Sequence, residues 1–294
     1  EGMLESEMAA AMAGGVTSLV CLPDTDPPLD EPGLVEMLKF RARNLNMFVV
    51  GTLEHKQYED RQDAADSRTR KTVDTLAVGL TGDFRDAALG GGVNTYDATV
   101  VAGQLRFPDG RPGGLLDAPS FTKLTFGFTR LQDMLFLVPS LQDKHSGKLL
   151  AYMSVRGQLA MDNLDTTEQF RLGGAEGVRA FAPGEGTGDS GAVLSLEARL
   201  LPPESWFGRI ANELVLSVFV DAGYVRYRQK LPATGRGTDP NTASFTGAGV
   251  GVSWVRPGEY AVRLSVAAPL SGTPRSDTRE RSARLYLLAS KFFN

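Results

Sequence analysis

One arginine and one aspartate are the strongest candidates for chemistry in this sequence of 294 residues. Arg179 lies near the tip of a long, polar, glycine-rich loop at residues 163–190, and Asp221 is an inward-facing acid of a later segment. An arginine and a carboxylate that meet away from bulk water form a charge-assisted hydrogen bond, which is stronger than a neutral one. We therefore predict that this pair locks the loop in place, as a gate or plug requires. The alternative is a solvated loop arginine and an unrelated acid.

The other reactive residues lack the partners that catalysis needs. Residues 188–191 (Gly-Asp-Ser-Gly) repeat the nucleophile signature of chymotrypsin-like proteases, but a serine nucleophile needs a histidine base held by an acid. Neither His55 nor His145 lies in the sequence context of that base, and no metal-ligand spacing surrounds either of them. Cys21 is the single cysteine, which excludes an intramolecular disulfide and a cysteine-based metal cluster. We predict no catalytic residue, no metal site and no cofactor.

Composition narrows the class of protein. The net charge of −4 disfavours a nucleic-acid partner, because such proteins usually carry a basic face. No apolar run approaches the roughly 20 residues that a membrane-spanning helix needs, and the acidic first residues predict that no signal peptide is present. These patterns exclude helical spans only, since a transmembrane β-barrel places its apolar surface on every second residue.

Two unlike parts follow each other along the chain. Residues 1–46 predict a short α/β domain, with a helix over 5–13, a strand over 16–22 and a second helix over 33–45. From residue 47 onward, segments of alternating apolar and polar residues are separated by turns rich in Gly, Pro, Asp and Asn. We predict ten strands there, at residues 48–59, 72–84, 93–106, 119–131, 148–162, 191–201, 213–228, 242–255, 258–269 and 283–293.

The alternation fits either of two β architectures. Over residues 213–228, for example, Val218 and Val220 alternate with Ser217 and Asp221. A soluble sandwich turns its apolar faces inward and has strands of about five or six residues, whereas a membrane barrel turns them onto lipid and has longer strands. The length of the strands and the charges deep within them favour a mainly β fold: a partial antiparallel transmembrane β-barrel with a short N-terminal α/β appendage. A passive porin-like channel and a soluble β-sandwich binding module remain alternatives.

Several motifs in and after the loop carry a family resemblance. They are Phe170-Arg171-Leu172-Gly173-Gly174, Gly177-Val178-Arg179-Ala180-Phe181, Gly184-Glu185, Gly188-Asp189, Ser195-x-Glu197-x-Arg199 and Phe219-Val220-Asp221-Ala222-Gly223. Over about residues 47–294 the chain resembles the outer-membrane transporters of two-partner secretion, the haemolysin secretion/activation family of the barrel-assembly superfamily. The sequence departs from the family at Ala180, where the family has glycine. If that position needs a positive φ, the alanine would cost roughly 1 kcal/mol.

The resemblance implies a function and a set of site residues. It implies an outer-membrane protein, in contact with lipid, that moves an unfolded partner exoprotein to the cell surface. It also implies that the C-terminal strand, which ends in Lys291-Phe292-Phe293-Asn294, is recognised by the barrel-assembly machinery. The gating loop and its lock would comprise Val178, Arg179, Ala180, Phe181, Phe219, Asp221 and Gly223. The family's earlier strands and its periplasmic substrate-binding domains have no counterpart in the sequence, so we expect no secretion by this chain alone.

Residues 1–46 resemble a different family. The stretch from Leu4 to Leu19, followed by Pro23-Asp24-Thr25, is similar to part of a dihydroorotase barrel. The His-x-His metal motif of active members is missing, and Asp24 replaces the asparagine that binds substrate. A (β/α)₈ barrel needs about 250 residues, so we interpret this part as a remnant of a non-catalytic dihydroorotase-like protein. A dihydroorotase-type amidohydrolase stays open as an alternative function.

Overall fold

The structure, a computed structural model, describes residues 36–42, 45–62, 67–110, 118–134, 147–231, 240–275 and 282–292. Contacts divide the chain into two units, Glu1–Gly33 and Leu34–Asn294, and only the second contains described residues. The predicted helix over 5–13 and the predicted strand over 16–22 therefore lie outside the described residues. The assignment of residues 1–46 to a dihydroorotase-like domain stays a prediction.

The second unit is built on one antiparallel sheet of eleven strands, in the order β1-β2-β3-β4-β5-β6-β9-β10-β11-β12-β13. The strands are β1 Glu36–Ala42, β2 Leu45–Gln62, β3 Ser67–Asp86, β4 Gly92–Arg106, β5 Ser120–Asp133, β6 Lys148–Ala160, β9 Ser190–Leu201, β10 Leu214–Arg226, β11 Thr242–Arg256, β12 Tyr260–Ser271 and β13 Arg284–Lys291. A two-stranded sheet, β7 Phe170–Arg171 with β8 Thr187–Gly188, lies between β6 and β9 in the sequence. The helical turns are η2 Ala88–Gly90, α2 Glu204–Phe207 and η5 Gly208–Glu213. No described helix is long and apolar enough to cross a membrane.

All ten predicted strands are confirmed, each within a few residues of its predicted ends. The helix predicted over residues 33–45 is wrong for Glu36–Ala42, which forms an eleventh strand, β1. β1 pairs with β2 from Glu36↔Gly51 to Ala42↔Leu45. Since the free edge of a strand presents a row of unpaired N–H and C=O groups, an extended neighbour satisfies them and a helix does not. Among the described residues no pairing joins β1 to β13, so the sheet has two edges.

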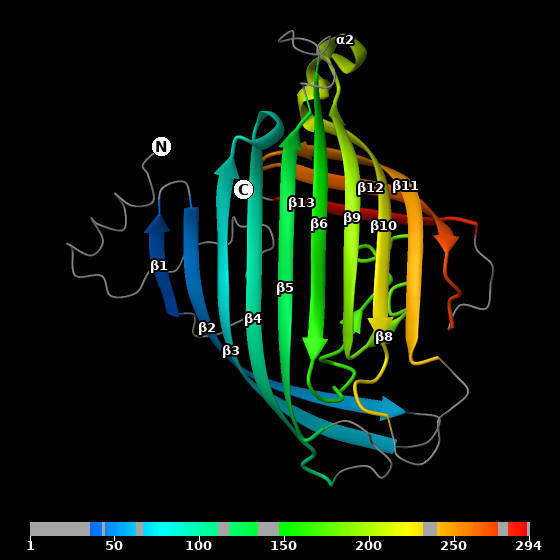
Figure 1. Ribbon diagram of the computed structural model, residues 1–294. Coiled ribbons are helices and arrows are strands. Elements are labelled where there is room, and N and C mark those ends of the chain that lie inside the picture. Colours follow the sequence, from blue (N-terminus) through cyan, green and yellow to red (C-terminus); the bar gives the residue numbers. More distant parts are fainter. Residues whose placement is uncertain are drawn as a thin grey trace. The chain divides into compact units, whose positions relative to one another are not determined.

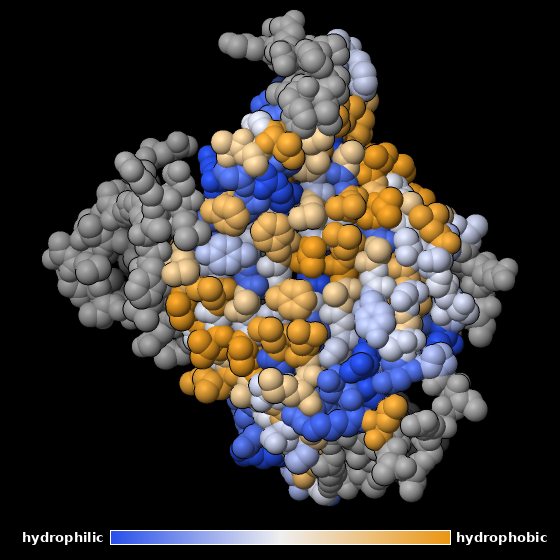
Figure 2. Space-filling model, in the orientation of Figure 1, coloured by the Kyte–Doolittle hydropathy of each residue, from blue (hydrophilic) through white to orange (hydrophobic). Residues whose placement is uncertain are grey.

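The two faces of the sheet differ in polarity, and the outer face is the apolar one, as a membrane barrel requires. Large apolar side chains such as Leu76, Val218 and Val250 are exposed on the outer face. Figure 2 shows apolar residues gathered over the middle of this face, with hydrophilic residues towards the bottom of the view. A soluble sandwich would bury these side chains, so the exposed apolar face supports the barrel architecture.

The inner face is covered by the connection between β6 and β9, residues 161–189, which contains all of the predicted loop except Ser190 (Figure 1). This connection bonds to or packs against residues of seven strands, namely β3, β5, β6, β9, β10, β11 and β13. Strands so far apart in the sheet reach one loop only because the sheet curves around it. The larger hydrophobic core of the unit lies between the loop and this face, with loop residues such as Leu172 and Val178 fully buried.

Candidate functional site: a loop locked to the inner face of the sheet

The predicted pair, Arg179 and Asp221, is in direct contact. The guanidinium donates Nε to Asp221 Oδ2 at 2.8 Å and Nη2 to Asp221 Oδ1 at 2.7 Å. The backbone N–H of Arg179 donates to the same Oδ2 at 3.1 Å. The Asp221 side chain is 0% exposed and that of Arg179 is 14% exposed. Two parallel N–H···O bonds in such a buried position fix the orientation of the loop tip and its distance from β10.

Three further side chains complete the arrangement. Arg179 Nη1 donates to Glu197 Oε1 at 2.8 Å, and Nη2 donates to Ser195 Oγ at 2.9 Å. Ser195 in turn donates to Asp221 Oδ1 at 2.7 Å. The guanidinium lies over the Phe219 ring, 3.3 Å from its centroid. We call Arg179, Asp221, Glu197, Ser195 and Phe219 the tip lock.

Strand register explains why these side chains meet. β10 pairs with β9 so that Asp221 lies opposite Ser195 and Phe219 lies opposite Glu197. All four point to the inner face because residues two apart on a strand share a face. Phe219, Asp221 and Arg179 were predicted, whereas Glu197 and Ser195 were not assigned a role. The sequence shows the spacing of Ser195, Glu197 and Arg199 in one strand. The residues that lie opposite them depend on the register between β9 and β10.

Within the tip lock, the cation of Arg179 lies against two carboxylates, those of Asp221 and Glu197. Burial by itself would lower the pKa of Arg179, but the hydrogen bonds and charge of Asp221, and then those of Glu197, outweigh burial and raise it. Arg199 donates Nε to Glu197 Oε2 at 2.7 Å and supplies a second positive charge. Its guanidinium lies over the Tyr152 ring, 3.7 Å from the centroid. The two carboxylates of the lock are therefore matched by two arginines.

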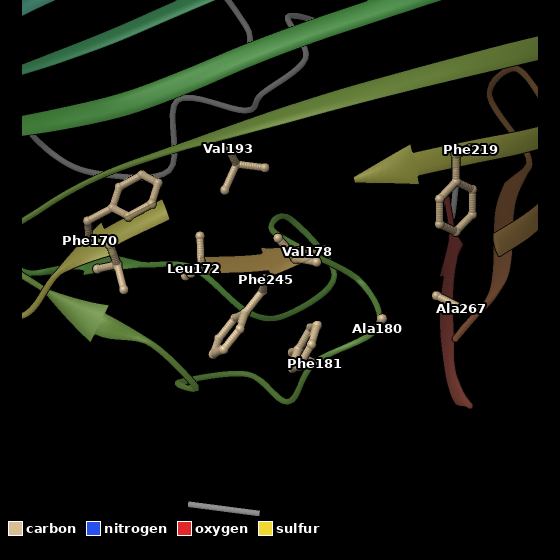
Figure 3. Packing of buried hydrophobic residues seen from close by; sticks show 10 residues of the cluster. Phe170, Leu172, Val178, Ala180, Phe181, Val193, Phe219, Phe245 and Ala267 are labelled. Carbon is tan, nitrogen blue, oxygen red and sulfur yellow. The ribbon is translucent and has the colours of Figure 1, made fainter. Parts of the chain in front are cut away.

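Apolar packing holds the loop on the other side of its tip. Phe181 stacks on Phe245 of β11, with ring centroids 4.1 Å apart and planes 10° apart. Figure 3 shows these two rings beside Val178, with Phe219 farther along the inner face. Tyr286 of β13 donates its hydroxyl to the backbone oxygen of Phe181 at 2.7 Å. The predicted residues Val178 and Phe181 thus bind the tip to the sheet by burial rather than by charge.

Ala180, the departure from the family pattern, causes no backbone strain. Leu89 is the one described non-glycine residue with a positive φ, so Ala180 has an ordinary conformation. Its methyl group faces Gly247 of β11, where any Cβ would collide with it. Gly223 likewise leaves room for the Leu172 side chain. Because Gly247 and Gly223 have no side chain, the loop can pack closely against the inner face.

A second set of charges anchors the start of the loop. Lys71 of β3 lies 2.7 Å from Asp165, and Lys123 of β5 lies 2.9 Å from Glu168. All four side chains are at most 12% exposed. Lys123 Nζ also donates to the backbone oxygen of Glu168 at 2.8 Å, as does Gln158 Nε2 at 3.0 Å. We call Lys71, Asp165, Lys123 and Glu168 the base clamp, which was not predicted from the sequence.

The protease-like tetrapeptide has a structural role at the end of the loop. Asp189 is fully buried and accepts the N–H of Leu164 at 3.1 Å and that of Gln229 at 2.8 Å. Ser190 Oγ accepts the N–H of Ala160 at 2.9 Å. His55 belongs to β2, where its ring contacts Asp74, and His145 lies outside the described residues. Among the described residues, no cluster of His, Cys, Asp and Glu is suited to a metal ion.

Comparisons with known proteins agree with this geometry. Residues 119–254 match the family described as haemolysin secretion/activation protein ShlB/FhaC/HecB. The resemblance to two-partner secretion transporters is confirmed. The heme/hemopexin transporter protein HuxB of Haemophilus influenzae is 24% identical over 233 residues, which are 78% of this chain and 38% of that protein. CdiB from Escherichia coli has a similar fold, with a TM-score of 0.63 and 19% identity over 87% of this chain and 44% of its own.

This similarity to outer-membrane transporters agrees with the barrel-type sheet and with the predicted outer-membrane location. The chain spans 38% of the length of the curated transporters it matches. A second, short match is to a dihydroorotase-like protein of Pseudomonas aeruginosa, 46% identical over 56 residues, or 18% of this chain and 13% of that protein.

Proposed function

We propose that this chain forms part of an outer-membrane passage for a secreted, unfolded exoprotein, and that the loop at residues 163–190 is its gate. The observation that carries the proposal is the tip lock, in which one arginine of the loop bonds to Asp221, Glu197 and Ser195 of two adjacent strands. A loop held along the inner face of a barrel wall occupies the space through which a passing chain must move. Passage therefore requires the loop to move.

The tip lock is suited to a gate because release depends on one side chain. Withdrawing Arg179 breaks four side-chain hydrogen bonds and the contact with Phe219 together. It also leaves the buried carboxylate of Asp221 without an arginine, which is costly, while Glu197 keeps only Arg199. Water that enters as the loop leaves, or polar groups of the passing exoprotein, would offset that cost. The closed state is thus stable when no exoprotein is present, and the loop can open when the exoprotein enters.

The passage would have the partners that the family implies, and it would carry out no chemical step. The exposed apolar face of the sheet would contact outer-membrane lipid, and β13 would carry the signal for the barrel-assembly machinery. Asp189 and Ser190 are engaged in hydrogen bonds that join loop and strands, so they are not offered as catalytic residues. We propose neither enzymatic activity nor a nucleic-acid partner.

The test compares two matched removals of one charge on the inner face. Asp221→Asn weakens the tip lock, whereas Asp97→Asn removes an inner-face carboxylate of β4, which pairs with β3 and β5. Conductance across planar bilayers is measured for this chain, and secretion of the partner exoprotein for a full-length relative with the equivalent changes. We expect Asp221→Asn alone to raise conductance and reduce secretion. Equal behaviour of the two variants would refute the gate and favour a passive porin-like channel.

A further inference from the structure

The connection between β9 and β10 exposes large apolar side chains that the proposed gate does not use. In α2 and η5, Trp206 is 62% exposed, Phe207 42% and Ile210 40%. This connection lies at the end of the strands opposite to the loop at residues 161–189, because successive antiparallel strands alternate in direction. Figure 1 shows α2 beyond the ends of β9 and β10. Three large apolar side chains are thus exposed in one short segment at this end of the strands.

Two aromatic residues of the outer face, Trp254 and Tyr260, lie at the same end of the strands as this connection. Trp254, near the end of β11, lies opposite Leu214, the residue that follows η5. It makes an edge-to-face contact with Tyr260 of β12, with ring centroids 5.1 Å apart. Farther along the same face the strands expose apolar residues such as Val218 and Val252. Trp254 and Tyr260 therefore mark the border of the apolar surface of the sheet.

Glu213, the last residue of η5, ties the connection to these two aromatic residues. It accepts hydrogen bonds from Trp254 Nε1 at 2.8 Å, from the Tyr260 hydroxyl at 3.1 Å and from Arg256 Nε at 2.8 Å. A second bond, from Asn212 Nδ2 to Glu204 Oε1 at 3.0 Å, joins the two helical turns. The position of Trp206 relative to the strands is thus fixed by side-chain contacts as well as by the backbone.

We propose that α2 and η5 form an interfacial membrane anchor, in which Trp206, Phe207 and Ile210 enter the headgroup–acyl boundary of the outer membrane at this end of the strands. Tryptophan and tyrosine favour this zone because each has an apolar ring and a polar group, and barrel proteins carry such girdles at both borders of their apolar band. The exposed side chains of Glu204 and Arg209 lie in the same segment and can meet the polar headgroups. Continuity with the lipid-facing surface makes lipid, rather than a protein, the occupant.

The anchor has a consequence for the two strands that it joins. β9 carries Glu197 and Ser195, and β10 carries Asp221, so every hydrogen-bond acceptor of the tip lock lies on this hairpin. An anchor at the connection would fix the depth and tilt of these acceptors in the membrane while the loop moves.

The sequence offers a direct optical test because it contains only two tryptophans. In Trp254→Phe the sole tryptophan is Trp206, and in Trp206→Phe it is Trp254. Each variant is placed in phosphatidylcholine vesicles brominated either near the headgroups or near the acyl ends. Fluorescence is analysed in the membrane-inserted fraction, which is isolated by flotation and by heat-modifiable migration.

We expect bromines near the headgroups to quench Trp206 several-fold more strongly than bromines near the acyl ends, and aqueous iodide to quench it weakly. Trp254, at the border of the same surface, should behave similarly and serves as the matched reference. If iodide quenches Trp206 freely and neither brominated lipid does, while Trp254 is quenched by lipid, the anchor is excluded. Protection from iodide that appears only when the exoprotein is added would assign the surface to a protein partner and overturn the proposal.

Discussion

The two anchors of the loop, at its tip and at its base, are built in different ways. At the tip a single guanidinium reaches two carboxylates, a hydroxyl and an aromatic ring. At the base each lysine has its own carboxylate, Lys71 with Asp165 and Lys123 with Glu168, on strands that are not neighbours in the sheet. The tip therefore concentrates its charged contacts in one side chain, whereas the base distributes them over two.

For the proposed gate, this difference favours movement at the tip of the loop. An anchor that depends on one residue is released in one step, but a distributed anchor survives the loss of any one contact. Arginine suits the first design because its planar fork binds a carboxylate through two bonds and stacks on a ring, and lysine cannot do both. We infer that the tip swings and that the base stays attached as the hinge.

Asp221→Arg should have the largest effect. It places a second guanidinium next to Arg179 and removes the acceptor of four hydrogen bonds, three from Arg179 and one from Ser195. Breaking a buried ion pair costs about 3–5 kcal/mol. The loop tip should be cleaved by added protease far more quickly than in the unchanged protein, and channel conductance should rise. The exchange Arg179→Asp with Asp221→Arg restores opposite charges and should recover part of the protection. Unchanged cleavage in the single variant would show that the pair does not hold the loop.

Arg179→Lys should have the next largest effect, although the charge is retained. A lysine ammonium cannot hold both oxygens of Asp221, reach Glu197 and cover the Phe219 ring, so we expect a loss of about 2 kcal/mol. Protease cleavage at the tip and conductance are measured as before. If lysine maintains full closure, charge alone holds the tip, and the contrast between a concentrated and a distributed anchor fails.

The fold was predicted more completely than the anchors, for a physical reason. Lipid outside and polar groups inside impose an alternation of period two on every strand, which can be read in the sequence alone. The exception, β1, is a short segment whose extended form depends on pairing with β2. Arg179 and Asp221 were found because charge and family motif both mark them. Glu197 was missed as a partner because its role depends on how β9 and β10 align.

The base clamp shows where sequence reasoning ends. Lys71 and Asp165 are 94 residues apart, and Lys123 and Glu168 are 45 apart. Nothing in the local pattern of either lysine distinguishes it from other inward-facing polar residues of a strand. The pairs exist because the sheet curves until β3 and β5 reach the start of the loop, and that curvature is a property of the whole sheet.

Gly247→Ala should have a moderate effect confined to the tip. The new methyl group would collide with the Ala180 methyl, and such overpacking costs about 1–2 kcal/mol. The sharper measurement is a double-mutant cycle with Ala180→Gly, which removes the opposing methyl group. Since Ala180 has no positive φ, the glycine should be tolerated alone and should rescue Gly247→Ala. Additive costs for the two changes would mean that these residues do not meet when the gate is closed.

The smallest effect is expected where the base loses a complete ion pair. Lys123→Met with Glu168→Gln removes both charges together, and replacing a buried pair in this way is often close to neutral. Lys71 still holds Asp165, and Gln158 still donates to the backbone oxygen at position 168. Conductance and cleavage at the tip should therefore stay near those of the unchanged protein. The matching pair of changes at the tip, Arg179→Met with Asp221→Asn, should open the channel because Glu197 then loses its partner in the loop. A base variant that opens the channel as widely would place the moving part at the base and reverse the assignment of hinge and gate.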